Sequence, residues 1–147
     1  MKKNIIDFIS NSIKEKISIL KLELDSIQNE KNNITKSSAG DKFETSRSTM
    51  QIEYDKLNNQ INILHNQLKL IESIDYSIKK SRVGIGSLIK TNKSYYFICV
   101  GLGNYTIDKK TIYVISLASP IGKILNNKKE GDNIIFNNRS EKIQKII

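Results

Sequence analysis

The chain has 147 residues, a formal net charge of +9, 38% apolar residues and 27% charged residues. This length suits one or two small domains, and the composition is typical of a folded protein rather than a disordered one. The longest apolar run, residues 95–103, is far shorter than the roughly 20 residues of a membrane-spanning helix. Acidic and polar residues follow the basic N-terminus, and the single cysteine excludes a disulfide framework and a cysteine metal site. We therefore expect a cytoplasmic protein without a signal peptide.

The positive charge is concentrated in the second part of the chain. Residues 1–80 hold 13 Lys and Arg against 11 Asp and Glu, whereas residues 81–147 hold 11 against 4. A basic domain favours a polyanionic partner, either a nucleic acid or an acidic protein surface. A solubilising surface rich in lysine would have the same composition.

Two long helices are predicted in the first part of the chain. Residues 4–35 contain neither Pro nor Gly and carry apolar residues at the three-and-four spacing of a heptad seam. The seam positions are Ile6, Ile9, Ile13, Ile17, Leu20, Leu24, Ile27, Lys31 and Ile34. Residues 42–79 repeat the pattern with Met50, Tyr54, Leu57, Ile61, Leu64, Leu68, Ile71, Asp75 and Ile78.

The two seams match each other as an antiparallel pair. Placing Ile13 opposite Ile71, Leu20 opposite Leu64 and Ile27 opposite Leu57 keeps the sum of the residue numbers constant. Ile6 falls opposite Ile78 in this register, and Lys31 falls opposite Tyr54 in a companion register. A helical hairpin with its tip near residue 42 is therefore predicted, although periodicity alone also allows helices from separate chains to pair.

The predicted tip is the polar segment 37–44, which contains Asp41 and Glu44 three residues apart. Residues at this spacing share one helical face. The same pattern at the start of a helix is typical of a capping box, in which both acids bond backbone amides. Phe43 lies between the two acids, and its ring either packs back onto the hairpin or contacts a partner.

Residues 81–147 are predicted to form a small sheet domain, because glycine and β-branched residues become frequent after residue 81. Strands are expected at 87–91 and 94–100, around an Asn92-Lys93 turn, and at 111–117, 133–136 and 141–147. Ser119 and Pro120 are typical of the cap and first turn of a helix. Glu130-Gly131-Asp132 then reads as a turn. The fold class is α+β, with a helical hairpin at residues 1–80 followed by an antiparallel sheet domain with one short helix.

Two motifs together resemble the Gre family of transcript cleavage factors. The string Ser119-Pro120-Ile121-Gly122 followed by Glu130-Gly131-Asp132 is similar to a helix and turn of that family's FKBP-like C-terminal domain. The hairpin with Gly40-Asp41-Lys42-Phe43-Glu44 near its tip resembles the family's stalk and acidic tip. The resemblance covers most of the chain in the right order.

The resemblance implies a monomeric transcription elongation factor that binds RNA polymerase. The motifs at 119–122 and 130–132 would dock the sheet domain at the rim of the secondary channel, and the stalk would reach the active centre. There Asp41 and Glu44 would help to hold a Mg²⁺ ion near the 3′ end of the nascent RNA, with Gly40, Lys42 and Phe43 as further tip contacts. Mg²⁺ would be bound only in the complex, since two carboxylates alone are a poor site, and the isolated chain would be neither an enzyme nor a metalloprotein.

Three alternatives remain open at this stage. Family members usually follow the tip glutamate with Asn-Ala-Glu-Tyr, whereas this chain has Thr-Ser-Arg-Ser at residues 45–48, so a regulator that occupies the channel without cleavage fits as well. A prolyl isomerase or chaperone would need an aromatic-lined pocket, and a coiled-coil adaptor would need no metal at the tip. The aromatic residues that could line such a pocket are Tyr95, Tyr96, Phe97, Tyr105, Tyr113 and Phe136.

Overall fold

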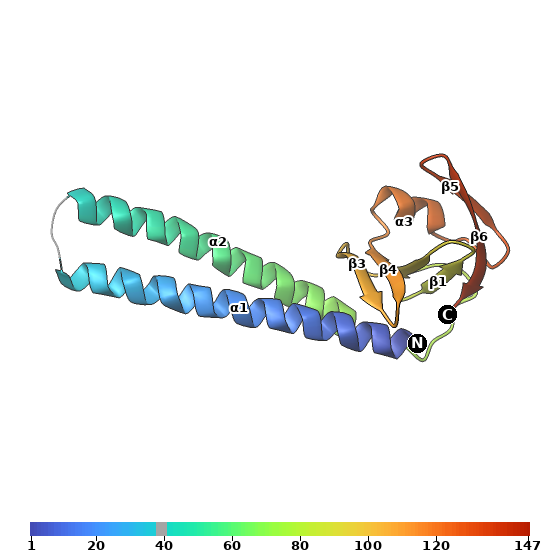
Figure 1. Cartoon of the computed structure of the whole chain (residues 1–147), viewed down its shortest axis with the longest axis horizontal. Helices are drawn as coiled ribbons and strands as arrows, with labels where there is room; N and C mark the ends of the chain where they lie inside the picture. Colours follow the sequence, from blue (N-terminus) through green and yellow to red (C-terminus); the bar gives the residue numbers. More distant parts are fainter. Residues whose placement is uncertain (38–40) are drawn as a thin grey trace. The chain divides into compact units, whose positions relative to one another are not determined.

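The computed structural model describes residues 1–37 and 41–147, and the side chains of residues 35–37 and 41–43 lie outside the described part (Figure 1). Two long helices come first, α1 (Lys2–Ser37) and α2 (Asp41–Glu72). The elements that follow are β1 (Leu88–Thr91), β2 (Tyr95–Ile98), β3 (Gly103–Ile107), β4 (Lys110–Ile115), α3 (Pro120–Leu125), β5 (Asn133–Phe136) and β6 (Arg139–Ile146). The predicted class, a helical hairpin followed by a small sheet domain with one short helix, is confirmed.

The chain divides into two compact units, which we call the hairpin unit and the sheet unit. The hairpin unit is residues 11–68, and the sheet unit combines residues 1–10 with residues 69–147. The sheet unit therefore includes the first residues of α1 and the last residues of α2, so its limits differ from a division at residue 80. Within this unit, the ring of Phe8 on α1 packs edge-on against Tyr105 of β3, with 6.1 Å between ring centroids.

In the hairpin unit, α1 and α2 run antiparallel, and the predicted seam is the protected side of each helix (Figure 1). Ile13, Ile17, Leu57 and Ile61 are buried. The remaining seam positions with described side chains are half-buried: Leu20, Leu24, Ile27, Lys31, Ile34, Met50, Tyr54, Leu64 and Leu68. The heptad spacing thus identifies the packed faces correctly.

Helix α2 ends earlier than the sequence pattern predicts. It stops at Glu72, and the two last predicted seam residues, Asp75 and Ile78, are exposed outside the helix. The Asp75 carboxylate accepts hydrogen bonds from the backbone N–H and the hydroxyl of Ser77, at 2.9 and 2.5 Å. Short polar side chains that bond the local backbone in this way compete with helical hydrogen bonds. The predicted pairing of Ile6 with Ile78 is therefore wrong.

The strands of the described residues form one sheet in the order β3-β4-β2-β1-β6-β5. All neighbours are antiparallel except β2 and β4, which are parallel and place Tyr96 beside Tyr113. The sheet is thus mostly antiparallel, as predicted, but the parallel pair was not predicted, and neither was strand β3 at the edge. The predicted turn at Asn92-Lys93 is confirmed, since Thr91 N–H donates to the Ser94 carbonyl at 2.9 Å.

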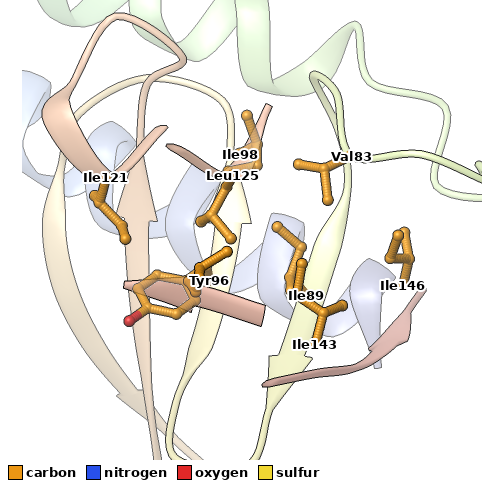
Figure 2. Packing of buried hydrophobic residues seen from close by; sticks show 9 residues of the cluster. Val83, Ile89, Tyr96, Ile98, Ile121, Leu125, Ile143 and Ile146 are labelled. Carbon is orange, nitrogen blue, oxygen red and sulfur yellow. The ribbon is translucent and has the colours of Figure 1, made fainter. Parts of the chain in front are cut away.

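One face of this sheet and helix α3 enclose the core of the sheet unit. Figure 2 shows the apolar side chains of β1, β2, β6 and α3 gathered with Val83. Ile89, Ile98, Leu125 and Ile143 are fully buried there. Among the helices that the structure describes, none is both long and apolar enough to span a membrane.

The single thiol, on Cys99 after β2, is a buried group of this unit. Burial raises the pKa of the Cys99 thiol to about 11, against 9.0 for an unperturbed thiol. Because the folded chain holds this proton more tightly than the unfolded chain, the thiol lowers the free energy of unfolding as pH rises from about 9 to 11.

We predict that iodoacetamide alkylates Cys99 about 100-fold more slowly in the native chain than in the denatured chain at pH 8. The thiolate is the reactive form, and a pKa raised by about two units depletes it about 100-fold. Mass spectrometry of timed reactions with and without urea measures both rates. Equal rates would show that the thiol is accessible in the folded protein.

Candidate functional site

Four of the five predicted tip residues, 41–44, form the first turn of helix α2, which begins at Asp41. Gly40 lies outside the described residues, and so do the side chains of Asp41, Lys42 and Phe43. Because α1 ends at Ser37 and α2 begins at Asp41, both acids belong to the hairpin's turn end, as the seam pairing predicts. Their binding of a metal or of backbone amides stays a prediction.

Glu44 is exposed and borders a shallow hollow of about 510 Å³ on the hairpin unit. The hollow is lined by Lys31, Glu44, Arg47, Ser48 and Gln51. The amino group of Lys31 donates a hydrogen bond to Gln51 Oε1 and so joins the two helices. Two cationic side chains and one carboxylate therefore line the same hollow.

Metal-ligand clusters are missing from the described parts of both units, where no three His, Cys, Asp or Glu side chains come together. The carboxylate of Asp41 is not among the described side chains. A complete protein cage is not what Mg²⁺ requires, since it is commonly held by one or two carboxylates with phosphates and water. Binding of Mg²⁺ at the tip therefore stays a prediction.

The predicted docking motif at 119–122 builds the start of helix α3. The Ser119 hydroxyl accepts a hydrogen bond from Gly122 N–H at 3.0 Å and donates one to the Ser116 carbonyl at 2.7 Å. Pro120 occupies the first turn, and Ile121 packs into the core. A β-carbon on Gly122 would lie 1.9 Å from the Ser116 oxygen, so only glycine fits there. Each residue thus has a structural role, and contact with a polymerase stays a prediction.

The second predicted docking motif forms the turn before β5. Gly131 has a φ of +92°, which favours glycine. The Glu130 carboxylate accepts a hydrogen bond from Ile146 N–H and the Asp132 carboxylate accepts one from Lys129 N–H, both at 2.9 Å. This motif also stabilises the local fold.

The sheet unit contains an aromatic-walled pocket of about 440 Å³. Tyr96, Tyr113 and Phe136 line it, so three of the six aromatic residues named from the sequence are brought together. The others lie elsewhere: Phe97 is fully buried in the core, Tyr105 packs on Phe8, and Tyr95 lies under the Lys110 amino group. The remaining lining residues are Ser94, Ile115, Ile121, Asn137, Arg139 and Glu141.

Glu141 is the charged group that the sequence did not single out for this site. It is only 8% exposed, and its Oε2 accepts a hydrogen bond from the Tyr96 hydroxyl at 2.7 Å. Burial, with this hydrogen bond as the next contribution, raises the pKa of Tyr96 well above its ordinary value. Tyr96 therefore stays protonated as a donor. An acid at an inward-facing strand position, two residues before buried Ile143, is the signal that could have revealed it.

Comparison with known proteins finds similarity among solved structures only at the level of the fold. No protein-family model matches the chain, and no curated protein is similar to it at a significant level. The crystal structure of the GreA factor homolog 1 (Gfh1) protein of Thermus thermophilus is similar over 94% of each chain, with 16% sequence identity and a TM-score of 0.37. A likeness at this level does not establish a shared family or function.

Proposed function

We propose that this chain is a Gre-like transcription elongation factor that binds RNA polymerase through its secondary channel and stimulates cleavage of backtracked RNA. Asp41 and Glu44 would complete a Mg²⁺ site together with acids of the polymerase and a phosphate of the RNA. The polymerase would perform the hydrolysis, and the metal would bind only in the complex. The motifs at 119–122 and 130–132 would face the rim of the channel.

The observation that carries this proposal is the placement of the two acids at the turn of an antiparallel hairpin. The helices pair along the predicted seam, α1 ends at Ser37, and α2 begins at Asp41. Helix α1 alone has 36 residues, or about 54 Å at 1.5 Å per residue. A paired helix of that length is stiff enough to present carboxylates inside a narrow channel, where phosphates and other acids supply the missing ligands.

A cleavage assay tests the proposal directly. We expect the chain to shorten the RNA 3′ end when it is added with Mg²⁺ to a stalled, backtracked elongation complex. Binding is measured in parallel by co-migration of the labelled chain with the polymerase. The proposal fails if the chain does not bind the polymerase at all.

A second candidate function is favoured by the surroundings of Glu44. Lys31 and Arg47 line the same hollow as this acid, and their positive charge opposes metal binding. A factor that occupies the channel and slows nucleotide addition without cleavage would fit this surface. In that case the same assay would give tight polymerase binding and RNA of unchanged length.

A further inference from the structure

The pocket in the sheet unit combines features that recognise one kind of ligand. The rings of Tyr96 and Tyr113 lie 5.7 Å apart with a tilt of 30°, and Phe136 adds a third aromatic wall. The volume of about 440 Å³ is within the range of pockets that hold small molecules or single side chains. Stacked aromatic faces attract cations through their ring electrons.

The carboxylate in this pocket is under-supplied with hydrogen-bond donors. Its Oε2 receives the short bond from Tyr96, but among the described residues its Oε1 has only Thr91 Oγ1, at 3.4 Å. The Thr91 hydroxyl also lies 3.2 Å from the Ser94 carbonyl, and one hydroxyl proton serves only one acceptor at a time. The described side chains form no ion pair with Glu141. A buried carboxylate with so few partners gains most from a cation.

We propose that this pocket receives an arginine side chain from a partner protein, with its guanidinium stacked on the tyrosine rings and bonded to Glu141 Oε1. A guanidinium is planar, weakly hydrated and able to stack while it bonds a carboxylate, which suits these walls better than an ammonium group. The inference does not rest on the proposed polymerase function, because the pocket lies wholly within residues 94–141.

The charge around the pocket indicates what surrounds that arginine. Residues 81–147 carry 11 basic against 4 acidic side chains, and Arg139 at the pocket is exposed. A basic surface repels a basic partner and attracts an acidic one. The matching partner surface is therefore acidic, with one protruding arginine that enters the pocket.

Blocked tripeptides added to the isotope-labelled full chain test this by NMR titration. We expect acetyl-Ala-Arg-Ala-amide to shift the resonances of Tyr96 and Tyr113 and to bind at least tenfold more tightly than its citrulline analogue, a neutral isostere. Acetyl-Glu-Arg-Glu-amide should bind more tightly still. Three results would each overturn the proposal. The arginine and citrulline peptides could bind equally, a proline peptide could bind best, or free arginine could bind more tightly than any peptide.

Matched variants assign the effect to the pocket. Glu141→Gln keeps an acceptor for Tyr96 and should weaken the Ala-Arg-Ala peptide about tenfold or more. Asp108→Asn removes one negative charge from the turn before β4, away from the pocket lining, and should leave affinity unchanged. Tyr113→Leu alters a partly exposed ring and should weaken binding even if Glu141→Gln fails to fold.

Arg139→Gln should strengthen binding of the same peptide by removing a like charge. The assignment would be contradicted if Asp108→Asn lost as much affinity as Glu141→Gln. It would also be contradicted if Arg139→Gln weakened binding.

Discussion

Asp41→Asn is expected to reduce RNA cleavage in backtracked elongation complexes on the order of 100-fold, the usual effect of removing a charge that acts directly on the reacting groups. Asparagine keeps the shape and the helix-capping ability of aspartate but lacks the negative charge that holds a divalent ion. The loss should therefore appear in cleavage and not in the stability of α2. Cleavage rates at several Mg²⁺ concentrations measure it, and more Mg²⁺ should restore part of the rate.

Two matched variants complete this experiment. Glu44→Gln should also reduce cleavage, but less than Asp41→Asn, because Lys31 and Arg47 line the same hollow as Glu44 and their positive charge would oppose a metal there. Glu53→Gln removes an exposed carboxylate further along α2 and should cleave normally. All three should bind the polymerase like the unaltered chain. Normal cleavage by Asp41→Asn would show that the tip acid only caps the helix.

The hairpin was predictable because a heptad seam is a local pattern with a single geometric consequence. Burial of Ile13, Ile17, Leu57 and Ile61 follows directly from it. The same pattern failed after Glu72, where α2 ends and Asp75 accepts local hydrogen bonds from Ser77 instead of continuing the helix. Apolar spacing does not report such competition between side chain and backbone.

The sheet unit was less predictable because its pairing is non-local. Strand β3 lies at the edge of the sheet and has mostly exposed or half-buried residues, so it lacks a strong apolar signal. The parallel contact between β2 and β4 joins strands that no short turn connects. That contact brings Tyr96 beside Tyr113 and so creates the aromatic pocket. The aromatic residues of the sequence therefore suggested a pocket, but the sequence could not show which of them line it.

The motif at 119–122, which the resemblance predicts to dock on a partner, has a role in the fold that can be tested directly. Gly122→Ala is expected to lower the free energy of unfolding by on the order of 3 kcal/mol, since a methyl group forced into a packed site costs roughly that much. The added β-carbon would lie 1.9 Å from the Ser116 carbonyl oxygen and 2.8 Å from Ser119 Oγ. Backbone at this end of α3 would have to move, and the Ser119 cap would be lost with it.

Gly101→Ala is the matched control for this prediction. A β-carbon there has no neighbour within 4 Å, so the change should alter stability by no more than about 0.5 kcal/mol. Urea unfolding of both variants, followed by circular dichroism, measures the difference as a shift in midpoint. If Gly122→Ala unfolded at the same midpoint as Gly101→Ala, the close approach at α3 would not constrain the fold, and the glycine of this motif would need a functional explanation such as contact with a partner. If Gly122→Ala is strongly destabilised, weakened binding of any partner by that variant reflects the damaged helix start and says nothing of direct contact.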